Sequence, residues 1–179
     1  MLGVDPGSQV TGFGVIECRG GRLIHVAHGT IRPRRDGSLA ARLHHLHDVM
    51  GEVIAEHRPD VASVEQVFVA ASPRAALVLG QARGAVLAAL GEAGLSLSEY
   101  AAARIKQAVS GSGCAAKSQI QRMVQRLLVL ESVPATDAAD ALAAAICHAH
   151  AGRLGALGAG PRARRRARGS PQLRVRRAP

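Results

Sequence analysis

Four carboxylates interrupt apolar segments of the chain, where a charge is costly unless something compensates it. Asp5 follows the apolar residues "LGV", and Glu65 lies inside "SVEQVF". Asp137 and Asp140 are three residues apart in the alanine-rich run "TDAADALAAA". On a helix they would share one face with Cβ atoms roughly 5–6 Å apart. Two like charges that close repel by about 4 kcal/mol at an effective dielectric constant near 20, so the pair needs a positive partner.

Divalent cations would be suitable partners for such a group. Functional residues of open α/β sheets gather at strand ends, so Asp5 and Glu65 would meet if their strands are neighbours. The helix with Asp137 and Asp140 could then lie over the same place. Ligation by oxygen alone is typical of Mg²⁺ or Mn²⁺. Two such ions ~3.5–4 Å apart would provide the activated water and the leaving-group clamp of phosphodiester hydrolysis.

Each of these residues also has a purely structural interpretation. Asp5 precedes Pro6-Gly7 and could cap a turn. Asp137 could be an acid of the first helical turn, which the helix dipole favours. Glu65, in the middle of an apolar run, is harder to explain in this way. The metal-site hypothesis therefore depends on the four residues together.

Lysine is scarce in this chain. Of the 23 lysine and arginine residues, all except Lys106 and Lys117 are arginine. The composition suggests a general replacement of lysine by arginine, and the two retained lysines are candidates for sites that need a compact ammonium group. Retention by chance is the other explanation.

The order of predicted elements indicates an α/β protein. Strands are predicted at residues 1–5, 11–17, 21–31, 60–68 and 95–102, and helices at 38–57, 72–94, 105–109, 115–130 and 134–150. The second and third strands alternate around Gly20-Gly21, which is typical of a hairpin. Three antiparallel strands followed by alternating helices and strands predict a mixed sheet with helices on both faces.

The basic excess is confined to the end of the sequence. The net charge is +10, and residues 151–179 contain nine arginines and no acid, which leaves +1 for residues 1–150. We expect one folded domain over residues 1–152 and a disordered, Arg-rich tail over residues 153–179. Such a tail could raise non-specific affinity for DNA, or it could be a solvated end without a defined role.

Cysteine spacing and hydropathy indicate a cytoplasmic protein. Cys18, Cys114 and Cys147 have no metal-ligand spacing and are expected to be reduced thiols. The N-terminus lacks the pattern of a signal peptide, and no stretch approaches ~20 uninterrupted apolar residues, so no membrane span is expected.

Several blocks of the sequence resemble the RuvC family of bacterial Holliday-junction resolvases. They are "LGVDPGSQVTGFGVIE", "VEQVF", "LGQARG", "EYAAARIKQAVSGSGCAAKSQIQ" and "DAADALAAAICHAH", in order across residues 1 to about 150. The resemblance implies a ribonuclease-H-like fold with a mixed five-stranded sheet flanked by helices. It further implies a homodimer that cuts two symmetric strands of four-way DNA junctions, in recombination and repair, together with the RuvA–RuvB branch-migration complex.

The resemblance also assigns residues. The family's four catalytic, Mg²⁺-binding acids, for which Mn²⁺ could substitute, map onto Asp5, Glu65, Asp137 and Asp140. A family aromatic that engages bases at the junction centre maps onto Phe68, which could otherwise be a core residue. The lysines important for activity and DNA contact map onto Lys106 and Lys117.

The chain departs from the family at two places. Where the family usually has a Lys-Asn pair after "VEQVF", this chain has Ala71 and Ser72, and Arg74 could replace the lost DNA contact. The first strand begins about two residues later than usual, so it is expected to be short. The helix with "LGQARG" contains Gly80 and Gly84, which would allow close helix approach either in a dimer or within the monomer.

Two other functions would share some of these features. A catalytically inactive junction-binding module would have the same fold, but it would not need four acids and two lysines. "GVDPGS" also resembles the first phosphate loop of actin-like kinases and ATPases. That function requires a second phosphate loop and an adenosine motif, which the sequence lacks.

Overall fold

The structure, a computed structural model, describes residues 1–33, 37–66 and 72–158, with side chains described up to residue 152. The strands are β1 (Leu2–Asp5), β2 (Thr11–Arg19), β3 (Arg22–Ile31), β4 (Val61–Glu65) and β5 (Ser96–Tyr100). The helices are α1 (Leu39–His57), α2 (Pro73–Glu92), α3 (Ala102–Ser110), α4 (Lys117–Leu128) and α5 (Thr136–Gly158).

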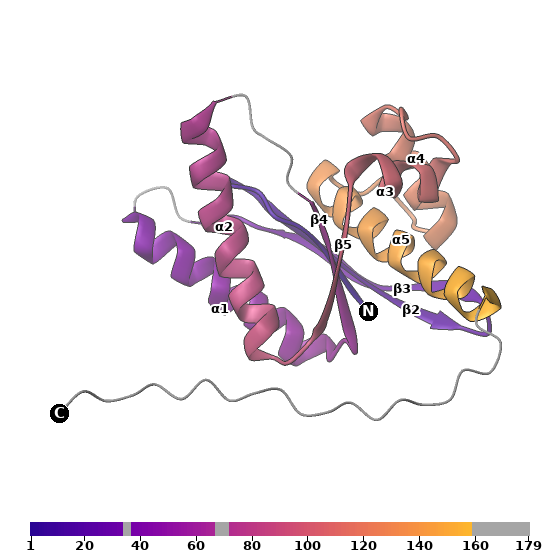
Figure 1. Cartoon of the computed structure of the whole chain (residues 1–179), viewed down its shortest axis with the longest axis horizontal. Coiled ribbons are helices and arrows are strands. Elements are labelled where there is room, and N and C mark those ends of the chain that lie inside the picture. The colour runs from indigo at the N-terminus through magenta and orange to yellow at the C-terminus, as the bar shows by residue number, and fades with distance from the viewer. Residues whose placement is uncertain (34–36, 67–71, 159–179) are drawn as a thin grey trace.

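The five strands form one mixed sheet in the order β3-β2-β1-β4-β5. β2 pairs antiparallel with both β1 and β3, whereas β4 pairs parallel with both β1 and β5. Helices α1 and α2 lie on one face, and α3, α4 and α5 lie on the other (Figure 1). The predicted mixed sheet with helices on both faces is therefore confirmed, and β1 lies at its centre.

Local sequence signals explain most element boundaries. The side chains of Ser38 and Ser72 cap α1 and α2 by accepting hydrogen bonds from the main-chain N–H groups of Ala41 and Ala75. Pro73 occupies the first position of α2, where its missing N–H costs nothing.

The last helix is longer than its predicted range of 134–150. It begins at Thr136 and continues to Gly158, through Gly152 and Gly155, although glycine disfavours the helix interior. The predicted domain boundary at residue 152 therefore falls inside α5. Residues 159–179 lie outside the described part of the chain.

The sheet separates two hydrophobic cores. One lies between the sheet and α3, α4 and α5, and it includes Ile16, Val124 and Ile146. The other lies between the sheet and α1 and α2, and it includes Met50 and Val86. All five of these side chains are fully buried.

Glycines allow α5 to lie almost directly on the backbones of β1 and β2. Gly3 and Gly14 pair across these two strands. A Cβ atom at Gly3 would collide with the main-chain oxygen of Ala141, and one at Gly14 would come within 2.6 Å of the Leu142 side chain. The small residues on both sides of this contact set the distance between α5 and the sheet.

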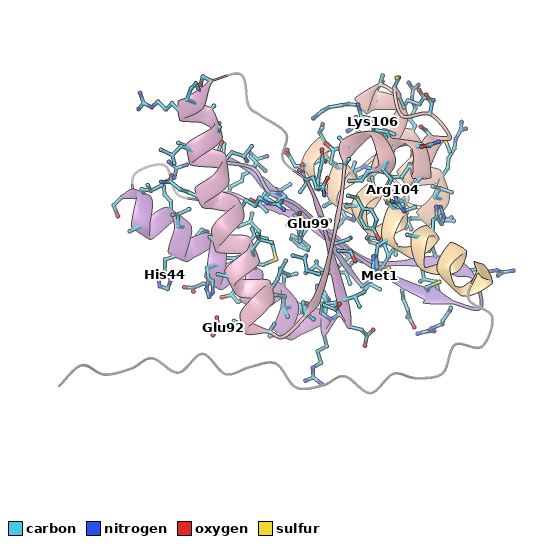
Figure 2. All side chains as sticks on the ribbon, in the orientation of Figure 1. Met1, His44, Glu92, Glu99, Arg104 and Lys106 are labelled. Carbon is cyan, nitrogen blue, oxygen red and sulfur yellow. The ribbon has the colours of Figure 1, made fainter. Side chains whose placement is uncertain are left out.

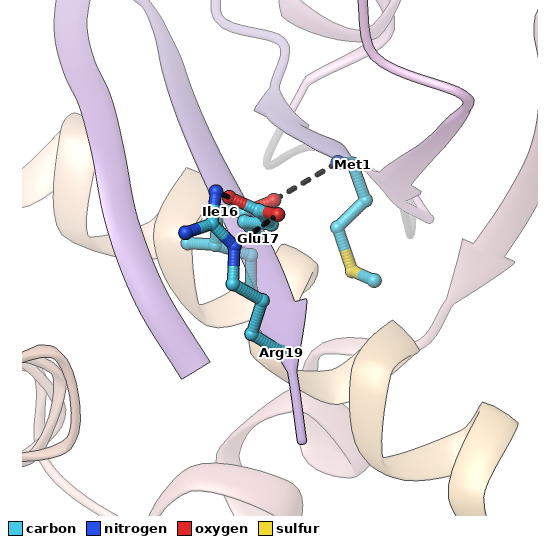
Figure 3. A network of polar contacts seen from close by, with 4 residues as sticks. All are labelled: Met1, Ile16, Glu17 and Arg19. Carbon is cyan, nitrogen blue, oxygen red and sulfur yellow. Dashed lines mark hydrogen bonds and ion pairs between the residues drawn. The ribbon is translucent and has the colours of Figure 1, made fainter. Parts of the chain in front are cut away.

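The first residue of the chain takes part in the sheet. The amino group of Met1 donates a hydrogen bond to the Ile16 carbonyl at 2.9 Å, and the Ile16 N–H donates to the Met1 carbonyl at 3.1 Å (Figure 3). Nearby, Arg19 forms an exposed ion pair with Glu17 at 2.7 Å. The strand expected to be short is a four-residue β1 whose pairing with β2 extends through Met1.

Helix α2 exposes much of its apolar surface. By length and composition alone it could cross a membrane, which for a single helix carries little weight, and only 22% of its most apolar 18-residue window is buried. Leu77 is 64% exposed. A Cβ atom at Gly80 or Gly84 would meet nothing within 4 Å, so these glycines do not serve packing among the described residues.

Candidate active site

Sheet register brings the first two carboxylates together. Val4 of β1 pairs with Val64 of parallel strand β4, so the following residues, Asp5 and Glu65, lie side by side at the ends of their strands. Both residues are half-buried. The two strands are neighbours, which is the condition under which the sequence placed these two carboxylates together.

Helix α5 begins over the same strand ends. Asp5 pairs on its other side with Gly12 of β2. A Cβ atom at Gly12 would collide with the main-chain oxygen of Asp137, in the first turn of α5. Asp140 follows on the same helix face and is also half-buried. The ends of β1 and β4 and the start of α5 therefore bring four carboxylates to one region.

Burial and mutual repulsion disfavour full ionisation of this group. Burial is the main cause that raises the pKa of Asp5 from an ordinary 3.8 to about 7, and the charge of Glu65 is the next. Burial also raises the pKa of Glu65, with the charge of Asp140 adding to it. The pKa of Asp140 is raised by burial against the opposing charge of Lys117.

Two lysines balance part of this charge. The ammonium group of Lys117, at the first position of α4, donates a hydrogen bond to Oδ2 of Asp140 at 3.4 Å. The Lys117 side chain is 70% exposed, so its ammonium also remains open to solvent. Lys106 of α3 lies near enough for its charge to lower the pKa values of Glu65 and Asp140 (Figure 2).

The donor chemistry of this site suits a hard divalent cation. Carboxylate oxygens are the preferred ligands of Mg²⁺ and Mn²⁺, and a cation would relieve the repulsion that raises the pKa of Asp5. Within the described ranges, however, no group of three or more His, Cys, Asp or Glu side chains is arranged to hold a metal ion. The fit to a cation therefore rests on the chemistry and charge of these side chains.

The two remaining candidate residues are Phe68 and Arg74. Phe68 lies outside the described residues, as does Ala71. Arg74 is exposed in the first turn of α2. Ser72, which stands where the family has asparagine, caps this helix. The DNA contacts suggested for Phe68 and Arg74 stay predictions.

One residue that contacts the site, Arg83, was not singled out from the sequence. Arg83 of α2 donates a hydrogen bond to the main-chain carbonyl of Glu65 at 2.7 Å and forms an ion pair with Glu99 of β5 at 2.6 Å. The only available signal was its place in "LGQARG", which predicted a possible interface helix. The contact itself joins residues 18 positions apart and has no sequence signature.

The model of the family described as crossover junction endodeoxyribonuclease RuvC matches residues 1–148. This chain belongs to the RuvC family. A RuvC of Janthinobacterium sp. (strain Marseille) is 53% identical over 160 residues, which cover 89% of this chain and 88% of the relative. A RuvC of Delftia acidovorans is 56% identical over 154 residues, with 85% of each chain covered.

Solved RuvC structures agree with this assignment. Thermus thermophilus RuvC superposes with a TM-score of 0.78 at 33% identity, covering 87% of this chain and 97% of that one. The same protein in complex with Holliday junction substrate gives a TM-score of 0.81 at 33% identity and covers 86% and 94%. The resemblance to RuvC and the ribonuclease-H-like fold are thus confirmed, and the chain is a nuclease of this family.

Proposed function

We propose that this protein resolves four-way DNA junctions as a metal-dependent, structure-selective endonuclease that cuts two symmetric strands. The observation that carries the proposal is the convergence of Asp5, Glu65, Asp137 and Asp140 on the ends of β1, β4 and α5. The T. thermophilus RuvC complex with Holliday junction substrate supports the choice of substrate. Residues 1–152 would form the nuclease domain and act in recombination and repair.

The four carboxylates would hold two Mg²⁺ ions, for which Mn²⁺ could substitute. Bound there, the metals would supply Lewis-acid activation of water and stabilisation of the leaving oxygen. Asp5, on the central strand between β2 and β4, would be one of the residues that hold them. Glu65 approaches from one side and Asp137 and Asp140 from α5.

The lysines would act on the DNA phosphates. Lys117 lies beside the carboxylates and keeps an exposed ammonium, so it can offset charge on the scissile phosphate as that charge develops. Lys106 would hold the backbone nearby. Arg74 at the start of α2 would contact DNA on the other side of the carboxylates, and Phe68 would stack on an unpaired base, a contact worth roughly 1–3 kcal/mol.

A homodimer would place two such sites on the two strands to be cut. The exposed apolar surface of α2, with the open positions Gly80 and Gly84, is the surface we assign to this contact. Action with RuvA–RuvB in the cytoplasm, where bacterial DNA lies, completes the proposal.

A junction-cutting assay tests the function. Purified protein is incubated with a synthetic mobile four-way junction in Mg²⁺ or in EDTA, beside the Asp5→Asn variant. Paired, symmetric, ligatable nicks are expected that need Mg²⁺ and disappear in the variant. Junction binding should persist in the variant, because binding uses phosphates and DNA shape whereas cutting uses the metals.

The same assay identifies the alternative. Tight junction binding without nicks in Mg²⁺ or Mn²⁺ would mean that the protein is a binding module, and attention would turn to the Ala71-Ser72 replacement. Loss of binding together with cutting in Asp5→Asn would contradict the separation of the two roles.

A further inference from the structure

Arg83 is a half-buried arginine that joins α2 to the strand carrying Glu65. Its side chain is 14% exposed, and its two terminal nitrogens contact different strands. Nη1 donates to the main-chain oxygen of Glu65 at 2.7 Å, and Nη2 pairs with Oε1 of Glu99 at 2.6 Å. Figure 2 shows Glu99 near the middle of the molecule, between the two helical layers.

The carbonyl of Glu65 needs this donor because the sheet cannot supply one. The N–H of Gln66 donates to the Tyr100 carbonyl of β5 at 2.8 Å. In a trans peptide the preceding C=O points the opposite way, so the Glu65 carbonyl faces the side of β1. There β1 ends at Asp5, and the next residue, Pro6, has no N–H.

An unpaired, half-buried carbonyl at this point would be costly, and the strand end would be free to rotate. Arg83 supplies the missing donor with a charged group, and such hydrogen bonds are about twice as strong as neutral ones. Its ion pair with Glu99 in turn fixes the guanidinium, since Glu99 pairs with Val64, the residue before Glu65. Both contacts therefore hold the backbone from which the Glu65 carboxylate projects.

We propose that Arg83 is a positioning residue for Glu65, whose main chain it fixes so that the carboxylate projects toward the other acids of the site. This inference rests on the proposed function, in which Glu65 is a metal ligand. Arg83 itself touches neither DNA nor metal in this proposal. The hydrogen bond to Glu65 gives the arginine of "LGQARG" a role in the active site. The exposed surface of α2 remains available for a partner.

The first part of the test uses the full chain and four variants. Arg83→Ala removes both contacts, Arg83→Lys replaces the planar fork by a single ammonium, and Glu99→Gln removes only the charge of the partner. Arg19→Ala is the matched control, because it breaks an exposed arginine–glutamate pair on β2 of similar length, 2.7 Å. Mn²⁺ binding is measured by calorimetry and electron paramagnetic resonance. The other measurements are the thermal midpoint, the junction affinity in EDTA and the cutting rate as a function of Mg²⁺ concentration.

Arg83→Ala should weaken Mn²⁺ binding and raise the Mg²⁺ concentration for half-maximal cutting ~10–100-fold, as removal of groups that orient metal ligands typically does. Junction affinity in EDTA should stay within about twofold, because phosphate contacts are not involved. Arg83→Lys and Glu99→Gln should lie between this variant and the wild type, roughly 3–10-fold weaker for Mn²⁺. Arg19→Ala should match the wild type.

A double-variant cycle on Mn²⁺ affinity separates positioning from general packing. If Arg83 acts through Glu65, then adding Arg83→Ala to Glu65→Gln should weaken Mn²⁺ binding no further. Equal losses from Arg83→Ala in both backgrounds would overturn the proposal. A lower thermal midpoint with unchanged Mn²⁺ affinity would also overturn it, because that result describes a structural residue.

Three further outcomes keep the proposal testable. If Arg83→Ala does not fold, wild-type Mn²⁺ affinity in both Arg83→Lys and Glu99→Gln overturns it. If the wild type binds Mn²⁺ but cuts no junction, the proposed function fails, whereas the Mn²⁺ cycle still decides the role of Arg83. A wild type that binds no Mn²⁺ overturns both.

Discussion

Replacing Asp5 by asparagine should stabilise the metal-free protein at alkaline pH while it abolishes cutting. The Asp5 carboxylate is buried beside other acids, and its pKa is raised from 3.8 to about 7. An acid with a raised pKa keeps its proton up to a higher pH in the folded state than in the unfolded state. Folding therefore takes up a proton between about pH 4 and pH 7, and stability falls as pH rises through this range.

The expected size follows from the pKa of Asp5. The rise amounts to about three pKa units, and each unit corresponds to about 1.4 kcal/mol, so full ionisation of Asp5 costs at most ~4 kcal/mol. Asparagine also packs and hydrogen-bonds differently from a protonated aspartate, and solvent screens part of the repulsion. We therefore expect a gain of ~2–4 kcal/mol in the free energy of unfolding above pH 8.

Urea unfolding in EDTA measures this difference at pH 8 and pH 5, with all proteins at one concentration. The gain should shrink at pH 5 to about a third of its value at pH 8, because the wild type then holds its proton. Glu52→Gln on α1 is the control, since Glu52 is exposed and its removal should change stability by less than about 0.5 kcal/mol. Equal stability of Asp5→Asn and wild type at pH 8 would refute the reasoning. A stability difference that increases as the pH is lowered would refute it as well.

Three further outcomes are expected. Mg²⁺ at about ten times its dissociation constant should raise the free energy of unfolding of the wild type by ~1.4 kcal/mol, and that of Asp5→Asn by less, in calorimetric scans. Gly12→Ala should cost at least ~2 kcal/mol in urea unfolding and most of the cutting rate, because the new Cβ displaces the Asp137 main chain; wild-type cutting by this variant would contradict the role of this contact. Val129→Gly should raise stability by ~0.5–1 kcal/mol, because Val129 is 88% exposed and has a left-handed φ of 53°; unchanged or lower stability in the same assay would show that the valine is unstrained.

Much of the fold could be predicted because local signals and the strand order agree. Ser38 and Ser72 mark helix starts, and the Gly20-Gly21 turn marks the hairpin that orients β2 and β3. The end of α5 was predicted eight residues too early, since the helix continues through Gly152 and Gly155, residues that disfavour helix.

The acidic cluster could also be predicted, because strand ends collect functional groups and the spacing of Asp137 and Asp140 defines one helix face. The contacts that hold the cluster could not be predicted. Gly12 packs under the Asp137 main-chain oxygen, and the Arg83 side chain donates to the Glu65 main-chain oxygen, so both contacts join distant segments. Such contacts depend on packing distances that no local pattern encodes. The metal-ligand and DNA-contact roles of all eight candidate side chains stay predictions.

The division of the interior into two cores has a consequence for how this protein can change. The carboxylates are held between the sheet and α5, whereas Met50 and Val86 fill the layer of α1 and α2 on the other face. Substitutions in separate layers act on stability almost independently. The α1–α2 layer can therefore accumulate stabilising replacements that offset destabilising ones beside the carboxylates. Arg83 is an exception in that layer, since any change there reaches Glu65 through one hydrogen bond.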